Sequence, residues 1–120
     1  MLTQIKGLHH VTSLASSAAE NNRFFTEMLG LRRVKKTVNF DAPDVYHLYY
    51  GDEVGSPGTA MTYFPFPQAA RGRRGTGEVG TTAFAIPKGA GAAWTDRLAG
   101  LDVQAIETDT SFGETRVLFD

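Results

Sequence analysis

Apolar and polar positions in the first half of the chain follow patterns that predict four strands. Residues 5–14 contain several β-branched side chains, which are common in strands. Residues 31–40, 45–52 and 59–66 have apolar or aromatic positions among polar ones, and turn-forming residues separate them. These segments predict strands, and a helical pattern lies between the first and the second of them.

Residues 16–30 have the features of a helix with one buried face. Ser17 and Glu20 have the spacing of a capping box, in which each side chain bonds to a backbone N–H of the first turn. Gly30 can adopt the left-handed conformation that ends a helix. Apolar side chains at helical spacing are expected to face a core: Phe24, Phe25, Met28 and Leu29. The predicted order of the first half is β-α-β-β-β.

The second half of the chain repeats much of this order. Its predicted elements are a strand, a helix and two strands, at residues 81–87, 91–100, 101–109 and 114–120. Trp94 occupies the helix position that Phe24 has in the first half, and a Gly-Leu pair follows each helix. Such an internal repeat indicates two related structural units.

The repeat predicts an α+β fold made of paired βαβββ modules. The first module covers residues 1–66, residues 67–80 form a Gly- and Arg-rich linker, and the second module covers residues 81–120. The second module is expected to be truncated and to lack its last strand. The chain is therefore expected to be a fragment or a truncated product with an exposed sheet edge, which invites pairing with another chain.

Composition adds exclusions to this picture. There is no cysteine among the 120 residues, which excludes disulfides, thiolate metal sites and cysteine nucleophiles. The net charge is -1, so no overall charge attracts nucleic acid or anionic lipid. No apolar stretch approaches the ~20 residues that cross a bilayer, and polar residues interrupt any signal-peptide core. These features predict a soluble, cytoplasmic protein with no nucleic-acid or membrane partner.

Two motifs in the linker are interpreted as structural. Residues 75–80 spell GTGEVG, but a dinucleotide-binding motif needs a strand before it and a helix after it. Here arginines precede the motif and a strand pattern follows. The arginines of residues 71–75 are interpreted as a solvated face of the linker or a contact within the protein. The chain also contains no G-x-S-x-G elbow and no H-E-x-x-H motif.

The three histidines remain as candidates for chemistry. His9 and His10 are adjacent in a predicted strand, so alternation should turn them to opposite faces and leave one of them for a given site. His47 lies among aromatic residues and is interpreted as a histidine at the edge of the core with one hydrogen bond. A metal site needs three or four ligands, so any partners must come from elsewhere.

Several segments together resemble one family. The runs GLHHVTSLAS, FFTEMLGLRRVKKTVNFD, YHLYYGDEVGSPGTAMTYFPFP and RGRRGTGEV are similar to the N-terminal half of ring-cleaving, hydroquinone-type dioxygenases of the vicinal oxygen chelate superfamily. That superfamily also contains glyoxalases and bleomycin-resistance proteins. The resemblance covers residues 5–87 and implies paired βαβββ modules whose concave faces enclose a metal. It also implies Fe(II) or Mn(II) on two histidines and a glutamate, a hydroquinone- or catechol-like aromatic substrate, and O₂.

The resemblance assigns roles to three residues near the N-terminus. His10, the second histidine of the pair, corresponds to a metal ligand of the family. His9 and Thr12 correspond to residues that line the site and support the ligand or contact the substrate. Alternation agrees with this placement for Thr12, which should share the face of His10.

The other two ligands of the family have no counterpart in this sequence. They belong to a C-terminal module, and the matching positions here hold Thr82 and either Met61 or Thr62, which are poor ligands for a hard metal. The chain is therefore expected to be the N-terminal domain of a dioxygenase, inactive in isolation. Alone it is expected to bind divalent iron weakly or not at all. It is expected to form a homodimer or to pair with the missing C-terminal domain.

Two other functions stay open at this point. A glyoxalase-like lyase or isomerase would use a metal to polarise a carbonyl and a glutamate to move a proton, but no glutamate lies at the expected place. A metal-free binding module of the bleomycin-resistance type would hold a ligand in an aromatic groove. The residues that could line such a groove are Tyr46, Tyr49, Tyr50, Tyr63, Phe64 and Phe66.

Overall fold

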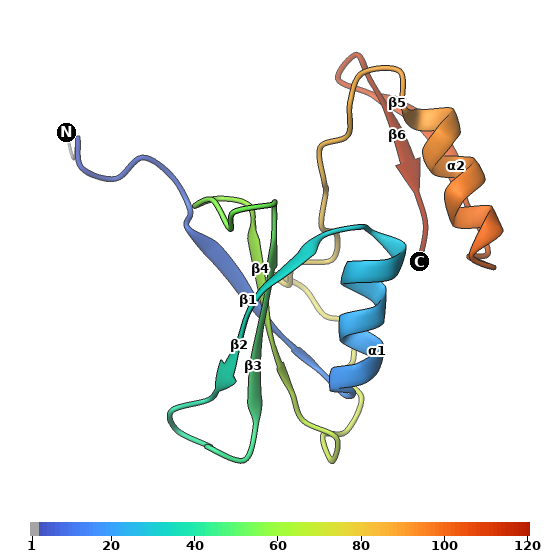
Figure 1. Cartoon of the computed structure of the whole chain (residues 1–120). Helices are drawn as coiled ribbons and strands as arrows, with labels where there is room; N and C mark the ends of the chain where they lie inside the picture. Colours follow the sequence, from blue (N-terminus) through green and yellow to red (C-terminus); the bar gives the residue numbers. More distant parts are fainter. Residues whose placement is uncertain (1–2) are drawn as a thin grey trace. The chain divides into compact units, whose positions relative to one another are not determined.

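The structure of the chain, a computed structural model, describes residues 3–120. The chain divides into two compact units, Met1–Arg71 and Gly72–Asp120. The division falls within the Gly- and Arg-rich residues 67–80. Each unit is described separately below (Figure 1).

The first unit is a four-stranded sheet with one helical segment. Its elements in chain order are β1 (His10–Ala15), α1 (Ala18–Arg23), η1 (Phe24–Met28), β2 (Arg32–Val38), β3 (Tyr46–Gly51) and β4 (Ala60–Pro65). The strand order in the sheet is β1-β4-β3-β2, with β1 parallel to β4 and the other neighbours antiparallel. The predicted β-α-β-β-β order is therefore confirmed for this unit.

The helical segment begins and ends where the sequence predicts. The Ser17 hydroxyl accepts a hydrogen bond from the backbone N–H of Glu20 at 3.2 Å, which caps α1. The segment then widens into the π-helical turn η1, where the N–H of Leu29 donates to the carbonyl of Phe24 at 3.0 Å. Gly30 follows with φ of +70°, a conformation that glycine adopts at little cost.

The core of the first unit lies between this helical segment and one face of the sheet. Phe25, Leu48 and Tyr50 are buried together. The ring of Phe25 stacks on that of Tyr50 with centroids 4.8 Å apart, and it also contacts Tyr63 at 4.9 Å. The apolar stripe predicted from the helical spacing thus faces the core through Phe25, and α1 lies beside the sheet in Figure 1.

The second unit contains a helix and a hairpin. The helix α2 covers Gly91–Gly100, with the predicted bounds, and the strands β5 (Glu107–Ser111) and β6 (Glu114–Leu118) pair antiparallel. Phe112 and Gly113 form the two-residue turn with φ of 52° and 78°, the backbone of a type I′ hairpin.

Two predictions for the second unit are wrong in part. Residues 81–87 form no strand. Among the described residues of the first unit, β1 pairs with β4 alone. No described segment takes the place of β4 beside residues 81–87. The strand predicted at 101–109 begins only at Glu107, because Asp102 and Ala105 have φ of 60° and 55°, which is incompatible with extended backbone.

Within residues 3–120, none of the helices has the length and the apolar character that crossing a membrane requires.

Candidate functional site

The two faces of the first unit's sheet differ in chemistry. Leu48 and Tyr50 of β3 point toward the helical segment, so by alternation His47 and Tyr49 point to the other face. Thr12 of β1 and Tyr49 are each paired with Thr62 of β4 in the register of the sheet. We call this second side of the sheet the open face. It collects polar side chains from three strands.

A chain of hydrogen bonds crosses the open face. The Oγ1 atoms of Thr12 and Thr62 are 2.8 Å apart, Oγ1 of Thr62 is 3.0 Å from Nε2 of His47, and Nδ1 of His47 is 2.9 Å from the Tyr49 hydroxyl. Thr62 is fully buried, with 0% of its surface exposed. Its position explains the burial of a polar residue, since the hydroxyl has a partner on either side.

The electrostatic surroundings of His47 favour its neutral form. Partial burial lowers the pKa of His47 below its ordinary value, and the nearby His10 and Lys35 lower it further. A neutral imidazole has one N–H donor and one acceptor nitrogen, which matches its two partners on this face. The ring of Phe64 stacks on that of His47 with centroids 3.9 Å apart.

His10 is the first residue of β1, an edge strand of the sheet, and His9 precedes this strand. Their Nδ1 atoms are 3.0 Å apart and the two rings meet edge to face. The Nε2 atom of His10 has no hydrogen-bond partner among the described residues. Strand alternation therefore does not describe this pair, because His9 precedes the strand. The ring of His9 contacts that of His10, although the sequence predicts that the two side chains turn to opposite faces.

Gly58 fixes the backbone at this histidine pair. Its N–H donates to the carbonyl of His9 at 2.7 Å, and its φ is +90°. A Cβ atom at this position would lie 3.4 Å from the carbonyl oxygen of Leu8. The turn between β3 and β4 thus needs a glycine where it approaches the start of β1.

The donor atoms of the described residues do not complete a metal site. No group of three or more histidine, aspartate or glutamate side chains comes together within residues 3–120. His10 has the arrangement typical of a ligating histidine, which it shares with His9: Nε2 has no hydrogen-bond partner among the described residues, and Nδ1 has a neighbour that can hold the tautomer. Met61 is on the opposite face from Thr62, whose hydroxyl is already bonded, and Thr82 lies outside any strand. His10 is thus the one predicted ligand with a suitable free atom.

The aromatic residues considered for a groove are divided between the two faces. Tyr50 and Tyr63 contact Phe25 in the core, whereas Tyr49 and Phe64 contact His47 on the open face. They therefore do not line one common groove.

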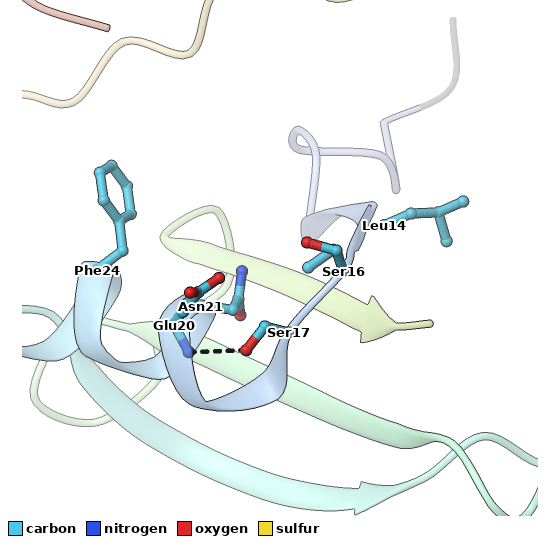
Figure 2. Close-up of a pocket in the computed structure, with 7 residues that line it drawn as sticks. Leu14, Ser16, Ser17, Glu20, Asn21 and Phe24 are labelled. Carbon is cyan, nitrogen blue, oxygen red and sulfur yellow. Dashed lines mark hydrogen bonds between the residues drawn. The ribbon is translucent and has the colours of Figure 1, made fainter. Parts of the chain in front are cut away.

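A separate hollow of about 400 Å³ lies at the start of the helical segment (Figure 2). Its lining residues are Leu14, Ala15, Ser16, Ser17, Glu20, Asn21 and Phe24. The side-chain oxygen of Asn21 is buried there and has no hydrogen-bond partner among the described residues. None of His9, His10 or Thr12 lines this hollow.

His47 makes more contacts than its sequence context predicts. The sequence predicts one hydrogen bond at the edge of the core, whereas the ring bonds to both Thr62 and Tyr49. One signal in the sequence pointed to this arrangement: His47 and Tyr49 are two positions apart in a strand pattern, so they share a face. Thr62 comes from the next strand, 15 residues after His47, and its place depends on the register of the sheet.

Comparison with known proteins identifies relatives by sequence. No protein-family model matches the chain. The "Putative ring-cleaving dioxygenase MhqE" of Bacillus subtilis is 50% identical over 117 residues, which are 96% of this chain and 38% of the relative. The chlorohydroquinone/hydroquinone 1,2-dioxygenase of Sphingobium indicum is 38% identical over 119 residues, which are 98% of this chain and 37% of the relative. The chain therefore spans well under half the length of these relatives.

Solved structures share the fold. A crystal structure described as a "putative dioxygenase" from Bacillus subtilis has a TM-score of 0.89 and 47% identity, over 95% of this chain and 36% of the other. A glyoxalase family protein from Enterococcus faecalis has a TM-score of 0.67 and 18% identity, over 95% of this chain and 88% of the other. The predicted resemblance is confirmed: the chain is related in sequence to ring-cleaving dioxygenases, and it shares its fold with a glyoxalase family protein.

Proposed function

We propose that this chain supplies one metal ligand, His10, to a ring-cleaving dioxygenase that acts on hydroquinone- or catechol-like aromatics with O₂. The observation that carries the proposal is the state of the His10 imidazole. Its Nε2 is free, its Nδ1 contacts His9, and it lies on an edge strand beside a polar open face. The names of the sequence relatives support the reaction class, and the Sphingobium indicum relative supports the hydroquinone substrate.

His9 and Thr12 have supporting roles in this proposal. If His10 binds a metal through Nε2, its Nδ1 carries the proton and donates to Nδ1 of His9 at 3.0 Å, which fixes the tautomer and the ring. Thr12 lies two residues along β1 from His10, on the same face, so its hydroxyl faces a substrate held beside His10.

The metal in this proposal is Fe(II) or Mn(II), which His10 would help to hold and which would supply the oxygen chemistry of ring cleavage. One imidazole is too few ligands for such a site. Another histidine and a glutamate therefore have to come from outside this copy of the chain. Pairing with a second copy of the chain or with a further domain would bring them to the edge of β1.

The experiment replaces the matching segment of the Sphingobium indicum enzyme with this chain. We call this protein the chimera. We expect it to contain iron and to consume O₂ in the presence of hydroquinone, and we expect His10→Ala to abolish both, because one of three ligands is lost. Val11→Ala, at the neighbouring residue of the same edge strand, is the matched control and should keep both.

Iron content and O₂ consumption that survive His10→Ala would contradict the proposal. A folded chimera that retains the iron ligands of the enzyme's remaining segment but has no ring-cleaving activity would contradict it as well. Binding of an aromatic ligand that is independent of metal and of His10 would favour a binding module instead.

A further inference from the structure

We propose that His47 and Thr62 act as a relay that orients the Thr12 hydroxyl as a hydrogen-bond donor toward the site, so that the site accepts an ionised substrate oxygen. The relay is the set of side chains joined across the open face: Thr12, Thr62, His47 and Tyr49. The identity of the ligand rests on the proposed function, whereas the direction of the hydrogen bonds is a property of this chain.

A relay of this kind has two self-consistent directions. In the first, the Tyr49 hydroxyl donates to Nδ1 of His47, the Nε2–H donates to Thr62, and Thr62 donates to Thr12. In the second, every donor and acceptor is exchanged. The direction is common to all three bonds, because a neutral imidazole carries a single proton and the hydroxyl of Thr62 is fully buried. When Nε2 of His47 donates to Thr62, the hydrogen of Thr62 has Thr12 as its acceptor among the described residues, and a buried hydroxyl without an acceptor would cost free energy.

The two directions leave different groups at the end of the relay that is near His10. In the first direction the Thr12 hydroxyl accepts from Thr62, so its own hydrogen is free to donate outward. In the second direction the Thr12 hydroxyl donates its hydrogen to Thr62, so toward the site it can only accept a hydrogen bond. The direction therefore decides whether the site offers a donor to an ionised oxygen or an acceptor to a neutral hydroxyl.

The chemistry of the partners favours the first direction. A phenol is a stronger hydrogen-bond donor than an aliphatic alcohol, because its O–H is more acidic, with a pKa of about 10. Nδ1 of His47 lies 2.9 Å from the Tyr49 hydroxyl, so it can accept the hydrogen of this phenol. Thr62 is fully buried, so water cannot replace its partners and reverse the order.

His47 is a positioning residue in this account, since it acts through Thr62 and Thr12. Its ring is held in place by the stacked ring of Phe64 on β4 and by the hydroxyl of Tyr49 on β3. Lys35 lies on the same face, with Nζ 5.4 Å from the centre of the Tyr49 ring. Partial burial, the nearby His10 and the positive charge of Lys35 all disfavour a second proton on His47, and they thereby preserve the acceptor nitrogen on which the relay depends.

The first test observes the direction itself in the 120-residue chain. Long-range ¹H–¹⁵N correlation spectra at pH 8 distinguish the imidazole tautomers. We expect His47 to have its proton on Nε2. A proton on Nδ1 would overturn the proposal, whatever the chain's function. Tyr49→Phe should raise the fraction of the Nδ1–H tautomer, because the donor to Nδ1 is removed, and Tyr50→Phe, on the other face, should leave the tautomer unchanged.

The second test uses the chimera. We expect His47→Leu to raise KM for hydroquinone about tenfold with a smaller change in kcat, because it removes a binding interaction. His47→Gln keeps an N–H donor for Thr62 and should restore most of the loss. An unchanged KM in His47→Leu would overturn the relay. Failure of the proposed function is a separate result, since it appears as activity that survives His10→Ala while the tautomer of His47 is as predicted.

Discussion

Tyr49 and Tyr50 are neighbours in β3, but their side chains lie on opposite faces of the sheet and have different surroundings. Tyr50 is fully buried against Phe25, its hydroxyl has no hydrogen-bond partner among the described residues, and burial raises its pKa to about 12. Tyr49 is partly exposed on the open face, and its hydroxyl bonds to His47. One face of the sheet is thus organised by ring packing, and the other by hydrogen bonds.

This difference separates stability from function within a single strand. The packed face buries large apolar surface, which is the main source of folding free energy. The open face has few buried side chains and keeps polar atoms ready for a ligand. The predictions below test whether the two faces differ in this way.

The largest expected effect is on the packed face. Phe25→Ala should lower the free energy of unfolding by about 3–5 kcal/mol, because it leaves a cavity where Phe25 contacts Tyr50 and Tyr63. Denaturant unfolding measures the loss. Phe64→Ala removes a ring of the same size from the open face and should cost less than half as much. Equal losses for the two variants would contradict the distinction.

Loss of the hydroxyl in the middle of the relay comes next. Thr62→Val keeps the shape of the side chain and should cost about 1–3 kcal/mol, because the ring N–H of His47 loses its buried partner. Thr37→Val, at the position paired with His47 on β2, is the control and should change stability by about 0.5 kcal/mol or less. If Thr62→Val costs no more than the control, the relay contributes nothing to the fold.

The pH dependence of stability should be smaller and specific to His47. Its pKa is lowered in the folded chain, so below about pH 6.5 the unfolded chain binds a proton more readily than the folded chain. The free energy of unfolding therefore falls as the pH drops through this value, and the fall ends below the lowered pKa of the folded state. Unfolding of the wild type and of His47→Gln across pH 5–8 measures the difference. Parallel curves would mean that His47 is not held neutral.

The smallest expected effect distinguishes the two tyrosines. Tyr50→Phe should be neutral or stabilising by up to about 1 kcal/mol, because it removes a buried hydroxyl that has no partner. Tyr49→Phe should instead cost about 0.5–1.5 kcal/mol, because its hydroxyl has one. Thermal unfolding of both variants makes the comparison, and the reverse order of stabilities would contradict it.

Local patterns predicted much of this fold. The bounds of α2, the cap at Ser17 and the four strands of the first unit follow from spacing, caps and turn residues that lie close together in the sequence. Residues 81–87 have the same strand-like composition but form no strand. A strand also needs a partner, and composition does not show whether one is present.

The site was less predictable, because it depends on contacts between distant residues. The resemblance to ring-cleaving dioxygenases indicated His9, His10 and Thr12 as a group. The hydrogen bond between Thr12 and Thr62 joins residues 50 positions apart and depends on the parallel pairing of β1 with β4. The role of His47 depends on that register as well, so the pattern around residues 46–50 could show which face it occupies but not what it meets there.

The most direct test of the account asks where this chain binds iron. Fe(II) is added without oxygen to the ¹⁵N-labelled chain, and the broadening of the three histidine resonances is followed. The account predicts weak binding that broadens His10 first and does not saturate at one equivalent, because the chain offers one ligand; His10→Ala should remove this effect. Tight stoichiometric binding, or broadening that is unchanged in His10→Ala, would contradict it.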